Sequence, residues 1–211
     1  MPKPIKFTYE KQPPYRDAFF FIIVCEGQNR EFDYFEFFNG MSSRVKVVPV
    51  KSDRGSNPTK LIEVAIEKER ELDASAERDR LWFVIDTDRW GAQLHDIRTE
   101  CGKHPHWRVA QSNPCFEVWL YYHFRNTLPT IDEIGNCGTW KRYLPTIIAG
   151  GFNSDKHPID IEIATGNART CYAFRGYFPE PGCTQVYELA DELIPLIKKD
   201  LDLLKVRFTT P

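Results

Sequence analysis

Between residues 17 and 124, strongly apolar segments alternate with segments in which apolar residues recur at helical spacing. The first kind is typical of strands that are covered on both faces of a sheet. The second kind is typical of amphipathic helices. We expect strands within residues 18–27, 44–52, 79–88 and 107–113, and helices within residues 29–38, 54–72, 91–103 and 113–124. This alternation with short connections predicts an α/β fold with an open, mostly parallel sheet flanked by helices.

Local signals refine three of these elements. Asn57 can cap the second helix, with Pro58 in its first turn, and Asn113 and Pro114 give the fourth helix the same signature. Pro49 weakens the end of the second strand because proline cannot donate a backbone hydrogen bond.

The pattern changes after about residue 125. Residues 126–145 read as loop-rich, and residues 159–174 and 184–204 read as helical, with Pro195 interrupting or kinking the last helix. We therefore expect a flexible arm over residues 1–16, an α/β core over 17–125, and a C-terminal helical region over 126–211 packed on that core.

Composition narrows the classes of function. The chain has 211 residues and a net charge of -2, so its overall charge provides no strong field to attract a polyanion. Its six cysteines include no C-x-x-C pair, and the sequence "MPKPIKFTYE" lacks an apolar signal region. We expect a cytoplasmic protein with free thiols and no membrane span.

Acidic residues stand where predicted strands end. Glu26 ends the first strand, Asp86 and Asp88 end the third, and Glu117 lies just after the fourth. In open α/β sheets, ligands bind at the carboxyl ends of the strands. Asp86 and Asp88 are two residues apart and so point to the same side of an extended chain. Together with Glu26 they predict a site for a hard divalent cation, Mg²⁺ with Mn²⁺ as a substitute, and this cation would compensate the charge of Glu26.

Simpler roles compete with these assignments. Acids near a helix start, such as Glu26, Glu31 and Glu117, also stabilise the helix dipole, and a single strand-end aspartate is often a cap or turn former. His123 reads as a core residue on an aromatic helix face, and Asp33 and Glu36 read as a solvated face. Cys101, His104 and His106 form a zinc-like cluster that lacks a second pair of ligands.

Several motifs together resemble one protein family. "VCEG" followed by "DTDRWG" is similar to the Toprim pattern, in which a Glu-Gly ends the first strand and an Asp-x-Asp-x-x-Gly ends the third, with Asp86, Asp88 and Gly91 filling the second motif. "IVCEGQNREFDYF", "GSNPTKLIEVAI", "SNPCFEVWLYYHF" and "CTQVYELADEL" resemble, more narrowly, the RloB-like proteins. These are Toprim-containing proteins associated with restriction loci and anti-phage defence. The resemblance covers roughly residues 19–200.

The resemblance implies a Toprim-like fold and Mg²⁺-dependent phosphoryl transfer. By residue, it implies that Glu26 is a general acid/base or metal ligand, that Asp86 and Asp88 hold the metal, and that Glu31 and Glu117 are further catalytic acids. The chain is too short for a topoisomerase and shows no added domains of a primase, so a nuclease is the use that remains.

Two functional hypotheses follow. The first is an RloB-type nuclease in bacterial defence that cleaves DNA or RNA, tRNA included. The second is a catalytically weak Toprim module that senses nucleic acid or binds a partner ATPase. A phosphatase with Asp86 as nucleophile fits poorly, because that family places its Asp-x-Asp on the first strand. Substrate contacts are expected first from Lys51, Arg54 and Arg89, and then from Lys141, Arg142, Arg169 and Arg175.

Overall fold

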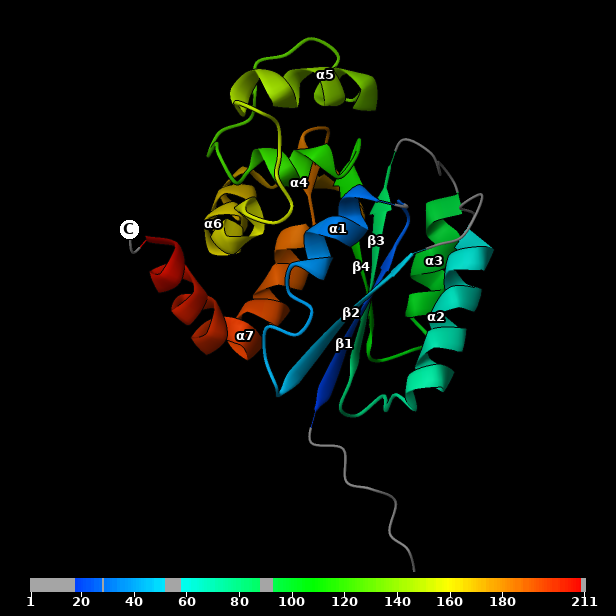
Figure 1. Ribbon diagram of the computed structural model, residues 1–211. Coiled ribbons are helices and arrows are strands. Elements are labelled where there is room, and N and C mark those ends of the chain that lie inside the picture. Colours follow the sequence, from blue (N-terminus) through cyan, green and yellow to red (C-terminus); the bar gives the residue numbers. More distant parts are fainter. Residues whose placement is uncertain (1–17, 28, 52–57, 88–92, 210–211) are drawn as a thin grey trace, which may run out of the picture.

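The computed structural model describes residues 18–27, 29–51, 58–87 and 93–209, and its centre is a five-stranded sheet (Figure 1). The strand order is β2-β1-β3-β4-β7. The first four strands are parallel to one another, and β7 pairs antiparallel with β4. The strands are β1 (Phe19–Cys25), β2 (Val45–Lys51), β3 (Arg80–Asp86), β4 (Trp107–Asn113) and β7 (Cys183–Thr184). The predicted open, mostly parallel α/β fold is confirmed.

Helices cover both faces of this sheet (Figure 1). One face carries α2 (Pro58–Leu72) and α3 (Leu94–Cys101). The other face carries α1 (Arg30–Glu36), α4 (Glu117–Tyr121), α6 (Ile161–Cys171) and α7 (Val186–Thr209), while α5 (Cys137–Ile147) lies beyond the carboxyl end of β3. A short 3-10 helix, His157–Asp160, leads into α6.

The alternation of side chains along the strands divides the interior into two cores. In β1, Phe21 and Ile23 join the larger cluster with α1 and the C-terminal helices, whereas Ile22 and Val24 join the smaller cluster with α2 and α3. Successive side chains of a strand point to opposite faces, so a strand covered on both faces must be apolar throughout. This is the physical reason for the uninterrupted run "FFFIIVC".

Strand β2 continues through Pro49 to Lys51, despite the proline. Pro49 pairs with Ile23 of β1, and β2 stands at the edge of the sheet. A proline is tolerated there because an edge strand does not need that N–H for a second neighbour.

The predicted cap of the fourth helix is wrong. Helix α4 begins at Glu117 with Phe116 in the N-cap position, and Asn113 is the last residue of β4. Asn113 pairs with Cys183 of β7, and its Nδ2 donates to the carbonyl oxygen of Pro179 at 2.7 Å. Pairing with β7 therefore keeps Asn113 in the sheet. The other predicted cap, Asn57, lies outside the described residues.

Residues 126–145 are not all loop, because α5 occupies the second half of this segment and extends to Ile147. The Asn136 side chain caps the helix by accepting a hydrogen bond from the backbone N–H of Thr139 at 3.3 Å. Trp140 and Leu144 are buried on one side of it. The glycines and Pro145 in this segment suggested a loop, but the cap and the buried stripe stabilise a helix.

The end of the predicted helix 159–174 and the residues after it contain strands that the sequence did not reveal. Phe174–Arg175 (β5) and Phe178–Pro179 (β6) form a hairpin, and β7 follows. Each has two residues, too short for an alternation of apolar and polar positions to be recognised.

Helix α7 is not interrupted at Pro195, which lies inside it, although the helix changes direction along its length (Figure 1). No helix within the described ranges is both long and apolar enough to cross a membrane. The expected arm over residues 1–16 lies outside the described residues.

Candidate active site

Glu26 follows directly after β1 and is 96% buried, with 4% of its surface exposed. Its Oε2 accepts a hydrogen bond from the backbone N–H of Asp86 at 2.8 Å, and its own N–H donates to the carbonyl oxygen of Val84 at 3.0 Å. A buried carboxylate needs such partners, and a hydrogen bond to the charged form stabilises it. The tip of β1 is thus fixed to the end of β3 through the Glu26 side chain.

Asp86 is the last residue of β3 and is half-buried. It alternates with Trp82 and Val84, which belong to the larger core, so it lies on the side of the sheet that α1 and α4 cover. The backbone after it is held by Thr87, whose N–H donates to the carbonyl oxygens of Ser112 and Pro114 at 2.9 Å each. Asp88, the second acid of the motif, lies outside the described residues.

Glu31 lies in the first turn of α1 and points back toward the chain just after β1. A Cβ atom at Gly27 would be 1.9 Å from Oε2 of Glu31, a separation that atoms cannot adopt. Gly27 therefore leaves the space that the Glu31 carboxylate occupies. This contact explains the glycine of the Glu26-Gly27 pair and places Glu31 beside the strand tip.

Glu31 and Glu117 form a buried acidic pair. Glu117 opens α4, and both side chains are less than a tenth exposed. Burial raises the pKa of Glu31, and the nearby charge of Glu117 raises it further. The guanidinium of Arg30 offsets part of this negative charge, because its Nε lies 3.6 Å from Oε1 of Glu117.

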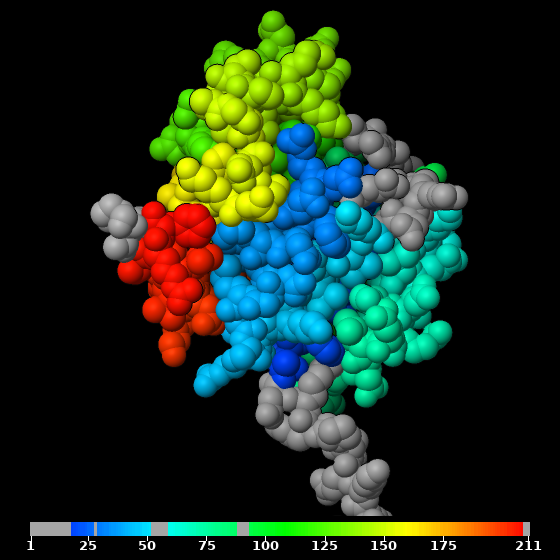
Figure 2. All heavy atoms as spheres, viewed as in Figure 1, coloured from blue at the N-terminus to red at the C-terminus, as the bar shows by residue number. Residues whose placement is uncertain are grey.

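Lys141 brings a second cation to the pair from α5. Glu117 and Cys137 raise the pKa of Lys141 although partial burial opposes them, and the Lys141 charge in turn lowers the pKa of Glu31. Arg30 and Lys141 are both exposed at the surface, and Figure 2 shows the segment that contains α5 lying above the atoms of α1. From its position in the sequence, Lys141 was expected only as a general substrate contact, and Arg30 was not expected near the acids. The cap and helical spacing of α5 are the signal that could have placed Lys141.

Two cysteine side chains lie close to Glu117. Side chains of Cys115, Glu117 and Cys137 are buried, and one ligand atom from each lies within 4.8 Å of the others. Hydrogen bonding to Cys137 and burial raise the pKa of the Cys115 thiol, and the charges of Glu117 and Asp86 add to this. Among the described residues, this group of three could hold a metal ion. Neither cysteine was expected from the sequence to belong to a site.

The carboxylates of Glu26 and Asp86 suit a different cation. Mg²⁺ is usually bound by one or two carboxylates, with waters and substrate phosphate completing its shell. Glu26 and Asp86 supply oxygen donors at neighbouring strand ends, and their linkage through the backbone N–H of Asp86 keeps them adjacent. Within the described part of the chain, no three carboxylates form a group as tight as the cysteine-containing one. The donor chemistry fits Mg²⁺ with two protein carboxylates.

The predicted substrate contacts are described only in part. Lys51 ends β2 level with Cys25 of β1, and its Nζ lies 4.2 Å from the centre of the Phe32 ring. The side chain is exposed at the same edge of the sheet as Glu26. Arg54 and Arg89 lie outside the described residues.

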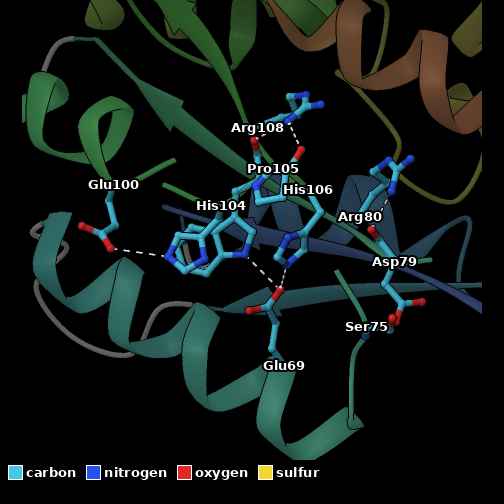
Figure 3. Close-up of polar contacts among 10 residues, drawn as sticks. Glu69, Ser75, Asp79, Arg80, Glu100, His104, Pro105, His106 and Arg108 are labelled. Carbon is cyan, nitrogen blue, oxygen red and sulfur yellow. Dashed lines mark hydrogen bonds and ion pairs between the residues drawn. The ribbon is translucent and has the colours of Figure 1, made fainter. Parts of the chain in front are cut away.

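The zinc-like cluster of Cys101, His104 and His106 is not assembled as a metal site. His106 shares a hydrogen bond of 2.6 Å with Glu69 Oε1, and His104 lies 3.5 Å from Glu100 Oε1 (Figure 3). His104 also stacks on the Trp107 ring at 3.9 Å. The residues near the start of β4 thus serve to join it to α2 and α3.

His123 lies in the core, as the sequence predicted. It is 6% exposed, and its Nε2 lies 3.1 Å from the hydroxyl oxygen of Tyr34. Burial lowers the pKa of His123 to about 3, so the ring is neutral at physiological pH. Asp33 and Glu36 are exposed, again as predicted.

Comparison with known proteins places the chain in a family. No curated protein and no solved structure matches the sequence significantly. The sequence model of one family, described as RloB-like protein, matches residues 21–193. The matched region contains every site residue that the structure describes, from Glu26 to Lys141. The chain therefore belongs to the RloB-like protein family.

Proposed function

We propose that this protein is a Mg²⁺-dependent nuclease that cleaves phosphodiester bonds in bacterial anti-phage defence. One observation carries the proposal: Glu26, Asp86, Glu31 and Glu117 converge at the carboxyl edge of the sheet, next to two exposed cations. The links are the Glu26–Asp86 hydrogen bond, the electrostatic coupling of Glu31 with Glu117, and the ion pair of Arg30 with Glu117. The described acids match, position by position, the residues that the family resemblance selects.

In the binding step, Glu26 and Asp86 would hold the cation. A bound Mg²⁺ would polarise the scissile phosphate and stabilise the leaving oxygen. The backbone N–H of Asp86 orients the Glu26 carboxylate, so the donor oxygens keep their place before substrate arrives. Arg30 and Lys141, exposed beside the acids, would contact the negatively charged backbone of the substrate.

The proton-transfer step assigns different roles to two neighbouring acids. Burial and the charge of Glu117 raise the pKa of Glu31 and favour its protonated form, although the cations Arg30 and Lys141 act in the opposite direction. Two adjoining carboxyls, one of which has a raised pKa, are suited to act as acid and base. Glu117 would then accept a proton from the attacking water, and Glu31 would hold a proton for the leaving oxygen.

A cleavage screen tests the proposal. Plasmid, single-stranded DNA and tRNA are incubated with the protein in Mg²⁺ or Mn²⁺, alongside Asp86→Asn and Glu117→Gln. We expect cleavage of at least one substrate and a loss of about a hundredfold or more in each variant, because both substitutions keep the shape and remove the charge. Asp88→Ala tests the second acid of the Asp-x-Asp motif in the same assay.

Glu77→Gln is the matched control. Glu77 is exposed in the turn before β3, at the opposite end of that strand, and its substitution should leave the rate unchanged. Near-normal cleavage by Glu117→Gln would reduce the site to Glu26, Asp86 and Asp88. No cleavage of any substrate with either cation would instead favour the second function, a Toprim module that senses nucleic acid or binds a partner ATPase.

A further inference from the structure

We propose that Cys115, Glu117 and Cys137 form a second metal site, which binds Zn²⁺ and joins helix α5 to the sheet. The ligand atoms come from three places in the chain: the segment between β4 and α4, the first residue of α4, and the first residue of α5. A metal bound there would connect the two parts of the chain that carry the candidate active site. The zinc site itself does not depend on nuclease activity, and only its effect on Glu117 rests on the proposed function.

The geometry is close to that of a bound site. The three ligand atoms lie within 4.8 Å of one another. Zinc–sulfur bonds of about 2.3 Å and zinc–oxygen bonds of about 2.0–2.2 Å in a tetrahedron place ligand atoms about 3.4–3.8 Å apart. The ligand atoms need to approach one another by about 1.4 Å at most, and rotations of side chains can provide this contraction. The fourth position of the tetrahedron would be taken by water.

The donor set selects a soft or borderline cation over Mg²⁺. Thiolates bind Zn²⁺ strongly, whereas Mg²⁺ prefers oxygen donors and gives up its waters reluctantly. All three side chains are buried, with Cys115 fully so, and this protects the ligands from competing water. The protein would therefore sort two cations between two adjoining sites, with Mg²⁺ at the carboxylates of Glu26 and Asp86.

Charge balance gives Lys141 a role in this site. On binding, the two thiols lose their protons to solvent, so Zn²⁺ with two thiolates and the Glu117 carboxylate carries a net charge of -1. The Lys141 ammonium interacts with Glu117, Cys137 and Cys115 and would neutralise that charge. The charge of Lys141 would repel Zn²⁺ if the ligands stayed uncharged. Once both thiols have lost their protons, the same charge stabilises the complex.

The site also restricts Glu117. A carboxylate held by zinc in the first turn of α4 is less able to accept a proton during cleavage. Zinc would then stabilise the fold and at the same time lower the activity of the neighbouring acid pair. The chain would respond to zinc availability through the one residue that both sites share.

Zinc content and a cobalt spectrum test the proposal without any nucleic acid. The reduced full-length protein is dialysed against Zn²⁺ with excess Mg²⁺, its bound metal is measured, and Co²⁺ is then used as a coloured substitute. We expect one zinc per chain, a thiolate-to-cobalt charge-transfer band, and a higher melting temperature with zinc than with Mg²⁺ alone. Cys137→Ser should weaken zinc binding by about a hundredfold or more and reduce the band, since it removes one of two thiolates.

Cys101→Ser is the control and should bind zinc as the unaltered protein does, since Cys101 belongs to the unassembled cluster beside His104. Cys115→Ser provides a second variant, in case Cys137→Ser unfolds. Three outcomes would overturn the proposal. They are the absence of zinc in the reduced protein, a cobalt complex without a charge-transfer band, and zinc binding in Cys137→Ser and Cys115→Ser that is as tight as in the unaltered protein. Because no cleavage is measured, these outcomes stay separate from the failure of the nuclease assignment.

Discussion

At the scale of single residues, the site depends on contacts between residues of different elements, most of which are far apart in sequence. Glu26 and Asp86 could be identified from the sequence, because an apolar strand that ends in a carboxylate marks the ligand-binding edge of such a sheet. The contact between Gly27 and Glu31 could not be identified. It depends on the angle between β1 and α1, which no local pattern encodes.

Gly27→Ala tests that contact. The added Cβ would occupy the position of the Glu31 carboxylate, 1.9 Å from its Oε2, so this flexible side chain must move. We expect a small change in melting temperature and a loss of about a hundredfold in cleavage, because a shift of about 1 Å in a positioned group has that effect. Gly166→Ala in α6 is the control, since its Cβ would meet open space, and it should stabilise the helix by about 0.5–1 kcal/mol. Unchanged activity in Gly27→Ala would remove Glu31 from the site.

The buried acid also predicts a pH dependence. Burial and Glu117 raise the pKa of Glu31 above its usual 4.5, so the folded protein binds more protons than the unfolded chain from about pH 4.5 up to the raised pKa. The free energy of unfolding contributed by this group therefore falls as the pH rises through that window. Relative to the unaltered protein, Glu31→Gln should gain stability as the pH rises above 4.5, measured by urea unfolding at several pH values. Glu36→Gln, an exposed acid on the same helix, controls for the loss of one charge; equal pH profiles for all three proteins would contradict the assignment.

At the scale of elements, strands and helices up to residue 124 followed from apolar periodicity, and those after it followed only in part. Helix α5 was hidden by Gly135, Gly138 and Pro145, residues that normally break helices. The structure retains the helix because Asn136 caps it and Trp140 is buried beneath it. Since Lys141 and Cys137 lie on α5, their place in the site could not be predicted without that helix.

The cap makes α5 open to a direct test. Asn136→Ala removes the side-chain acceptor for the N–H of Thr139, and we expect it to lower the free energy of unfolding by about 1 kcal/mol. Local opening of α5 should also increase, measured as faster hydrogen exchange at residues 137–147 than elsewhere. Asn126→Ala, an exposed asparagine in the preceding loop, should change neither quantity. Equal exchange in the two variants would mean that packing alone holds the helix.

At the scale of the whole molecule, the larger core contains residues from both sides of residue 125, where the sequence pattern changes. It contains Phe21 and Trp82 from the sheet together with Trp140 and Leu193 from the C-terminal region. The indole N–H of Trp82 also donates to Glu192 Oε2 on α7 at 3.1 Å. A change in pattern along the chain therefore indicates a change of architecture, and it does not by itself indicate a separate core.

A shared core predicts that α7 and the sheet unfold together. Leu193 is fully buried on α7, so Leu193→Ala leaves a cavity and should cost about 2–5 kcal/mol. Leu196, three residues further along the helix, is 37% exposed, and Leu196→Ala should change stability by about 0.5 kcal/mol or less. In urea, tryptophan fluorescence and far-ultraviolet circular dichroism should report one coincident transition in both variants, shifted to lower urea only in Leu193→Ala. If instead helical signal were lost first in Leu193→Ala while the fluorescence transition stayed in place, α7 would be an appendage, and the Trp82–Glu192 contact would contribute nothing to the stability of the sheet.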